Sequence, residues 1–195
     1  MIDHSTQYVK EVIEIAKKLD LAKIDHLANE ILKIRVNSGR LFIVGVGGSA
    51  ANASHAVNDF RKLCDIDALA PTDNIAEITA RTNDEGFETI FSDYLRVSKN
   101  SSKDGLLIFS VGGGNLEKNV SVNLINVIKQ ARKNKTKVFG IVGKDDGYTA
   151  QNADLAIVIP NVNQKNVTPH SESFQGIIWH CLVSNPKLKI FPTKW

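Results

Sequence analysis

Apolar residues in the first fifth of the chain recur with the spacing of an amphipathic helix. Between residues 5 and 37 they form two stripes, one that ends near Leu19 and one that begins near Ile24. Asp20 and Leu21 mark a break between the stripes. The pattern predicts a pair of helices, or one bent helix, that lies outside any strand pattern.

A different pattern follows, in which short apolar runs alternate with longer amphipathic segments. The runs cover residues 40–46, 105–111, 136–142 and 154–160, and a weaker run lies near 66–70. Runs that are apolar on both faces are typical of parallel strands covered by helices on both sides. The predicted helices span residues 49–63, 74–82, 86–99, 117–134, 145–152 and 169–184. The alternation predicts an α/β fold with a doubly wound, five-stranded parallel sheet flanked by helices.

Length and composition narrow this picture to one domain. The 195 residues are 43% hydrophobic and 23% charged, and no apolar run approaches the roughly 20 residues of a membrane helix. The N-terminus is charged throughout, so we expect no secretory signal. Cys64 and Cys181 lie too far apart in the sequence for a disulfide framework or a zinc ribbon, which favours the cytoplasm. A net charge of +3 is too small to demand a nucleic acid partner.

The single domain of residues 1–195 is expected to divide unequally. Residues 1–38 would form helices used in oligomerisation, because their apolar stripes need cover that the sheet does not supply. Residues 39–185 would form the α/β unit, and residues 186–195 an irregular tail. In that tail Ile190, Phe191 and Trp195 are expected to pack on a neighbour.

Two glycine-rich loops follow predicted strands and precede predicted helices. Their backbone N–H groups, together with a helix N-terminus, favour an anion. Neither loop has the dinucleotide pattern or a Walker sequence, so a nucleotide enzyme is disfavoured. One such turn more often only connects a strand to a helix, but two turns that both carry serine favour a small phosphate or sugar phosphate. The residues expected to hold it are Gly47, Gly48, Ser49, Ser110, Gly112, Gly113, Gly114 and Asn115.

Histidines and carboxylates recur on two of the predicted helices. His55 and Asp59 are four residues apart and share a face. Glu172, Gly176 and His180 run along one stripe of the last helix. Two histidines and two carboxylates suit Zn²⁺ or a similar divalent ion, whereas surface pairing and structural hydrogen bonds are the alternatives.

The remaining histidines, His4, His26 and His170, have no such neighbours and are interpreted as surface residues. The last helix is expected to begin with Thr168 as its N-cap and Pro169 at its first helical position.

These motifs occur together in one known family. The matching pieces are GVGGSAANASH (45–55), TNDEGFETIF (82–91), LIFSVGGGN (107–115), VFGIVGKDDG (138–147) and the late helix with Glu172 and His180. In this order and spacing the chain resembles the sugar isomerase (SIS) family, and within it the phosphoheptose isomerases. The resemblance covers nearly the whole chain and implies a flavodoxin-like fold with an N-terminal helical segment.

The resemblance also implies an activity, the conversion of sedoheptulose 7-phosphate to D-glycero-D-manno-heptose 7-phosphate through an enediol. Asp59 stands where the family has its glutamate base, and His180 would be the partner acid and base. Asn83 and Asp84 would orient sugar hydroxyls. Some members bind zinc, and the corresponding residues here are His55, Asp59, Glu172 and His180, with Glu172 in place of a glutamine. Family members are homotetramers with sites built between subunits, which implies the same assembly here.

Several positions depart from the family pattern. Val46 replaces an asparagine, Asp59 is shorter than glutamate, and SVGGGN lacks several hydroxyls of the phosphate-binding loop. Val167-Thr168 stands where the family often has Asp-Thr. These departures keep an alternative open, in which the chain is a non-catalytic sugar-phosphate-binding or protein-binding member.

Overall fold

The computed structural model of the chain describes residues 3–193, which begin with two helices, α1 (His4–Lys18) and α2 (Leu21–Val36). Each helix starts at an aspartate whose side chain caps it. The carboxylate of Asp3 accepts from the backbone N–H of Thr6, and that of Asp20 accepts from Lys23. The predicted helix pair and its break near Asp20 are therefore confirmed.

The centre of the domain is a parallel sheet with the strand order β2-β1-β3-β4-β5. The chain runs from β1 outward to β2, then crosses back to β3 and continues to β4 and β5. The winding therefore reverses between β1 and β3, and this is where doubly wound sheets bind ligands. All five predicted strands are confirmed, at Arg40–Val44, Asp67–Leu69, Gly105–Ser110, Lys137–Val142 and Leu155–Val158.

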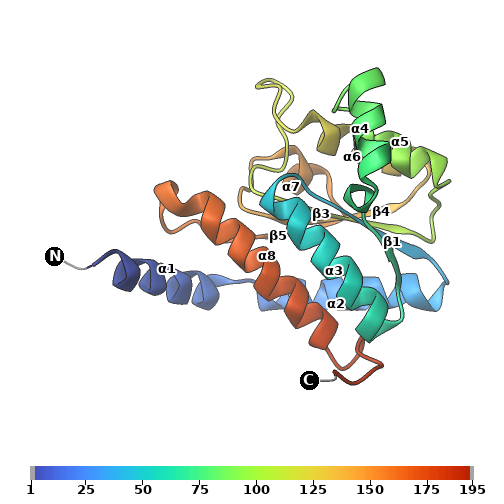
Figure 1. Cartoon of the computed structure of the whole chain (residues 1–195). Coiled ribbons are helices and arrows are strands. Elements are labelled where there is room, and N and C mark those ends of the chain that lie inside the picture. Colours follow the sequence, from blue (N-terminus) through green and yellow to red (C-terminus); the bar gives the residue numbers. More distant parts are fainter. Residues whose placement is uncertain (1–2, 194–195) are drawn as a thin grey trace.

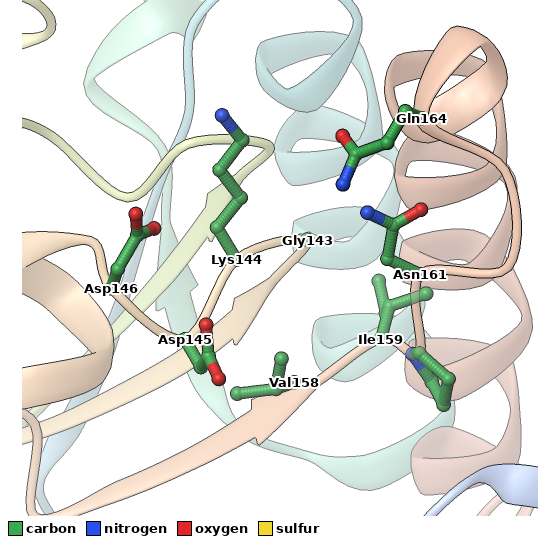
Figure 2. Close-up of a pocket in the computed structure, with 9 residues that line it drawn as sticks. Gly143, Lys144, Asp145, Asp146, Val158, Ile159, Asn161 and Gln164 are labelled. Atoms are coloured by element: carbon green, nitrogen blue, oxygen red, sulfur yellow. The ribbon is translucent and has the colours of Figure 1, made fainter.

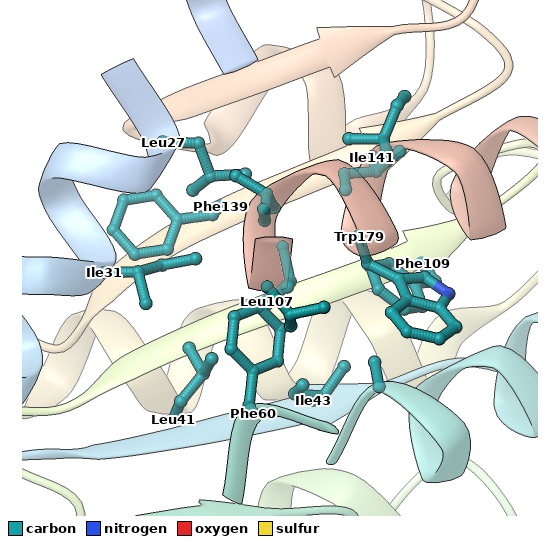
Figure 3. Close-up of a cluster of buried hydrophobic side chains, with 14 of the residues drawn as sticks. Leu27, Ile31, Leu41, Ile43, Phe60, Leu107, Phe109, Phe139, Ile141 and Trp179 are labelled. Atoms are coloured by element: carbon teal, nitrogen blue, oxygen red, sulfur yellow. The ribbon is translucent and has the colours of Figure 1, made fainter. Parts of the chain in front are cut away.

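Helices cover both faces of the sheet, as Figure 1 shows. Successive residues of a strand point to opposite faces, so Leu41 and Ile43 pack toward α2, α3 and α8, whereas Phe42 and Val44 pack toward α5 and α6. Figure 3 shows the first of these layers, in which Phe60 and Trp179 lie over Leu107 and Phe109. The helices are α3 (Gly48–Cys64), α4 (Ile75–Asp84), α5 (Ile90–Val97), α6 (Val122–Lys133), α7 (Tyr148–Asn152) and α8 (Val167–Ser184), with short 3₁₀ turns η1 (Pro71–Asp73) and η2 (Gln164–Asn166).

Several helix starts differ from the prediction because local hydrogen bonds compete with the helix. Residues before α6 form a turn in which Asn115 pairs with Val120 across an antiparallel bridge. Its side chain also accepts from the N–H of Lys118. Helix α8 begins at Val167, after Asn166, so the predicted start at Thr168 and Pro169 is wrong. Proline is tolerated there because the N–H groups of a first helical turn have no intrahelical acceptor.

The interpretation of His170 as a surface residue is also wrong. Helix α1 covers it, and its Nε2 lies 2.7 Å from Oε2 of the buried Glu11. Glu11 also accepts from the side-chain amides of Asn163 and Asn166. The Asn166 amide first, then His170 and Asn163, hold the pKa of Glu11 down at about 2. A polar network therefore fastens α1 to the start of α8, while His4 and His26 are exposed as expected.

The C-terminal tail is anchored against α3. Leu188 is buried, and the N–H groups of Ile190 and Phe191 both donate to the carbonyl of Leu63. The side chains of Ile190 and Phe191 remain about half exposed, and Trp195 lies outside the described residues. Among residues 3–193, none of the helices combines the length and the apolar character needed to cross a membrane.

Candidate active site

The first glycine-rich loop joins β1 to α3 at the point where the winding reverses. A Cβ on Gly45 would lie 2.5 Å from the backbone of Ser49, so only glycine lets the strand end so close to the helix. Gly47 has φ +63°, which favours glycine, and Ser49 is buried in the first turn of α3. The loop thus turns the chain sharply and directs the N-terminus of α3 toward the end of β3.

We expect Gly45→Ala to lower the free energy of unfolding by about 1–3 kcal/mol, because the new methyl group must displace helix backbone. Gly112→Ala is the matched control, since a Cβ there meets nothing within 4 Å and the residue has no positive φ. Urea unfolding of both variants measures the difference. Equal stability of the two variants would contradict the close approach at Gly45.

The second loop leaves β3, the neighbour of β1, so the two loops start about 5 Å apart at one edge of the sheet. Gly113 and Gly114 have φ +72° and +87°, and the N–H of Gly113 donates to the hydroxyl of Ser110 at 2.9 Å. The N–H of Asn115 is used by Val120. Within residues 3–193 the N–H groups of Gly112 and Gly114 have no protein acceptor. Of the four backbone N–H groups of residues 112–115, only those of Gly112 and Gly114 are therefore left to bind an anion.

Three of the predicted site residues converge on a different part of the molecule. His55 and Asp59 lie on α3 and His180 lies on α8, and one ligand atom from each falls within 4.8 Å of the others. Nε2 of His55 is 4.0 Å from Oδ2 of Asp59, and the two imidazole centroids are 5.4 Å apart. Helices α3 and α8 run side by side (Figure 1). The side-chain amide of Asn52 fastens them by donating to the carbonyl of Glu172 at 2.9 Å.

Neighbouring groups orient each side chain of this cluster. Nδ1 of His180 lies 2.8 Å from the carbonyl of Gly176, and since a carbonyl only accepts, Nδ1 carries the proton. Nε2 of His180 is then left with a lone pair. Asn58 donates to Oδ1 of Asp59 at 2.8 Å. The buried ring of Trp179 stacks on His180 with centroids 3.5 Å apart and meets His55 edge-on at 4.6 Å. Trp179 could not be assigned to the site from the sequence, because only the packing of α8 on α3 brings it against His55. Asn58 contacts its neighbour in the chain and carried no signal beyond that position.

The cluster opens into a groove of about 750 Å³ on the outer side of α3 and α8. Apolar walls come from Leu63, Ile177 and Val183, and Lys62 and Lys189 supply positive charge. Cys181 also lines the groove, and the described cysteines Cys64 and Cys181 are both free thiols. A groove with apolar walls and a few converging polar groups is the usual form of a small-molecule site.

Glu172 does not join the cluster. Its carboxylate lies against Gly48, where an added Cβ would be 2.6 Å away. Eight residues along α8 separate it from His180, which corresponds to about 12 Å of helical rise. The structure therefore assembles three of the four predicted metal ligands. Asn83 and Asp84 lie in the last turn of α4, exposed and paired with each other, and they do not line the groove.

The donor set itself fits a metal ion. Two imidazoles and one carboxylate are ligands that Zn²⁺ accepts, and three protein ligands leave a fourth position for water or substrate, as in catalytic zinc sites. His55 and His180 are exposed, and Asp59 is partly exposed, so an ion would reach them from the groove.

Comparisons with known proteins agree with this architecture. A family model described as SIS domain matches residues 6–143. The chain is 30% identical to a phosphoheptose isomerase from Nitratiruptor sp. over 189 residues, which cover 94% of this chain and 92% of that protein. It is 33% identical over 150 residues to the lincomycin biosynthesis protein LmbN from Streptomyces lincolnensis, covering 74% of this chain and 54% of that protein. The match thus spans about half the length of LmbN.

Solved structures share the fold over nearly the whole chain. The structure of phosphoheptose isomerase GmhA from Neisseria gonorrhoeae aligns with a TM-score of 0.80 at 23% identity. The alignment covers 92% of this chain and 95% of that one. The predicted doubly wound sheet with its N-terminal helices is confirmed by this likeness.

Proposed function

The chain belongs to the SIS domain family, and we propose that it is an isomerase that converts sedoheptulose 7-phosphate to D-glycero-D-manno-heptose 7-phosphate. The observation that carries the proposal is the convergence of Asp59 and His180 from two helices at one groove. This convergence favours an enzyme over a non-catalytic sugar-phosphate-binding or protein-binding member. Phosphoheptose isomerases match the chain at about 30% identity over most of its length, which supports the same substrate.

Asp59 and His180 divide the proton transfers between them. The carboxylate of Asp59 removes a proton from C1, and the C1–H electron pair becomes the C1=C2 double bond. His180, which for this step carries a proton on both ring nitrogens, donates its Nε2 proton to the carbonyl oxygen at C2. The enediol then loses the proton of its C1 hydroxyl and gains one at C2, which leaves an aldehyde at C1. No atom and no electron is exchanged with a second molecule.

The phosphate is best placed at the second loop. The carboxylate of Glu172 beside Gly48 puts negative charge at the N-terminus of α3, which disfavours an anion there. Ser110 and the free N–H groups of Gly112 and Gly114 carry no such charge. The sugar would instead contact Gly47, Gly48 and Ser49 of the first loop, together with Glu172.

His55, Asp59 and His180 would hold the metal if the enzyme uses one. Zn²⁺ at this place would take up Nε2 of His180, and it would then polarise the carbonyl group and stabilise negative charge on the enediolate oxygen in place of the proton from His180. The chain's own contribution is to hold Nε2 of His180 free, through the Gly176 carbonyl, and to aim Asp59 through Asn58.

The N-terminal helices support an oligomer. Val9 and Ile13 on α1 and Ile177 on α8 are about half exposed, and Figure 1 shows α1 extending beyond the sheet. Such apolar surface is suited to a second copy of the chain. We propose a homotetramer in the cytoplasm, with sites completed between subunits, and Asn83 and Asp84 reaching the sugar only in that assembly. Light scattering should give four chain masses, and a monomer would contradict the proposal.

The proposed activity is tested by incubating the full chain with sedoheptulose 7-phosphate. NMR of the mixture should show an aldoheptose phosphate, with added Zn²⁺ and with chelator as two separate arms. Unphosphorylated sedoheptulose is the control and should react far more slowly. Absence of turnover both with and without Zn²⁺ would overturn the proposal.

A further inference from the structure

A second pocket, of about 370 Å³, lies at the carboxyl ends of β4 and β5. It shares no lining residue with the groove of His55, Asp59 and His180. Figure 2 shows Asn161 and Gln164 on one side and Asp145 and Asp146 on the other, with Val158 and Ile159 between them. The carboxyl ends of parallel strands are the edge at which α/β sheets bind ligands.

The wall that carries Asn161 and Gln164 is held in place from behind. The neighbouring Asn163 and Asn166 donate to Glu11 at 2.7 and 2.8 Å. Gly143, which also lines the pocket, packs so closely on α8 that an added Cβ would collide with the hydroxyl of Ser171. Tertiary contacts with α1 and α8 therefore hold the pocket in place, which is a sign of a preformed site.

A narrow cavity of about 10 Å³ adjoins the pocket and shares Gly143, Ile159, Pro160 and Asn161 with it. His170 lines this cavity, and its buried Nδ1 has no hydrogen-bond partner among the described residues. Because the ionised Glu11 accepts from Nε2, Nδ1 is the ring nitrogen left without a partner. The cavity has room for about one water or one hydroxyl group, and either could form a hydrogen bond with this nitrogen.

We propose that this pocket binds a small uncharged sugar or polyol, with Asp145, Asn161 and Gln164 contacting its hydroxyls. Amide and carboxylate groups match hydroxyls as both donors and acceptors, and Val158 and Ile159 match the C–H face of a sugar ring. Asp145 and Asp146 face a single cation, Lys144, so the local charge disfavours a phosphorylated ligand. A ligand hydroxyl, or a water beneath it, completes the hydrogen bonding of His170.

The proposal does not require the isomerase activity, because the pocket lies beyond β4 and β5 and shares no lining residue with the groove of His55, Asp59 and His180. The two sites are neighbours at the same edge of the sheet, since the N–H of Gly143 donates to the carbonyls of Ser110 and Val111. The ligand would bind the segment that Glu11 ties to α1, so its binding would stabilise the docking of α1. The concentration of an unphosphorylated sugar would thereby influence how firmly α1, one of the helices proposed to form the oligomer, is docked.

Saturation-transfer NMR on the full chain, with D-mannose and myo-inositol as separate probes, tests the site. We expect at least one probe to bind, and Asn161→Leu with Gln164→Leu to weaken it about tenfold or more. Both residues are exposed, so the double variant should fold, which circular dichroism checks. His180→Ala is the matched control and should bind the probe as the wild type does.

Three outcomes would overturn the proposal. The first is that neither probe binds the wild-type chain. The second is that His180→Ala loses the probe while the double variant keeps it, because the ligand would then occupy the groove. The third is that inorganic phosphate displaces the probe at equal concentration, because the charge argument would then be wrong.

Discussion

Asp59→Asn is expected to lower kcat for sedoheptulose 7-phosphate by about 10²- to 10⁴-fold, the usual contribution of a general base. Asparagine has nearly the same shape but cannot take up a proton at the pH of the reaction. Asn58 and His55 keep the neighbouring positions filled, so the groove should retain its form. The kcat of the purified variant, measured by formation of the aldoheptose phosphate, checks the prediction.

Two further variants separate chemistry from folding. Asp59→Glu restores a carboxylate on a longer side chain and should recover most of the lost activity. Asp65→Asn makes the same chemical change at the exposed C-cap of α3, where φ is +51° and asparagine is well tolerated, so it should leave kcat unchanged. If Asp59→Asn retained kcat within a factor of ten, the base would lie elsewhere.

Replacing Glu11 with glutamine is expected to reduce the acid sensitivity of folding. The native pKa of Glu11 is about 2, whereas the ordinary value is 4.5. A depressed pKa stabilises the folded state fully above the unfolded value, and this contribution is lost as the pH falls from about 4.5 to 2. Thermal melts of the wild-type chain should therefore decline through this window, and those of Glu11→Gln should decline less.

At neutral pH the same variant should melt several degrees below the wild type, because Asn163, Asn166 and His170 lose their ionised acceptor. Glu14→Gln is the control, since Glu14 lies exposed on α1 and, within residues 3–193, pairs only with Lys18. Its melting temperature at neutral pH, and the decline of that temperature at acid pH, should match those of the wild type. If the melting temperature of Glu11→Gln fell with decreasing pH as steeply as that of the wild type, other carboxylates would govern acid unfolding.

The fold was predictable because its signals are local. Runs that are apolar on both faces belong to strands covered on both sides, and even the weak run near Ala68 forms β2. Helix starts were less predictable, since they depend on which backbone groups find partners in the folded chain. The backbone and side chain of Asn115 form hydrogen bonds within a turn, so α6 begins only at Val122.

The site was predictable only as far as one helix carries it. The spacing of His55 and Asp59 places them on one face of α3, and the structure agrees. Glu172 and His180 lie on one stripe of α8, yet α8 crosses α3 so that only His180 reaches the pair. Spacing along a helix determines on which face a side chain lies. The crossing of two helices determines which residues of that face contact the other helix.

His170 shows the same division most clearly. Nothing in the sequence near it indicates that α1, some 160 positions earlier, covers it. The sequence by itself determined the class of sheet, the two glycine turns and the His55–Asp59 face, since each depends on residues close together along the chain. Only the tertiary structure decided that Glu172 stays apart, that Glu11 holds His170, and that a second pocket opens beside them. Those outcomes depend on how helices far apart in sequence pack to bury their apolar faces.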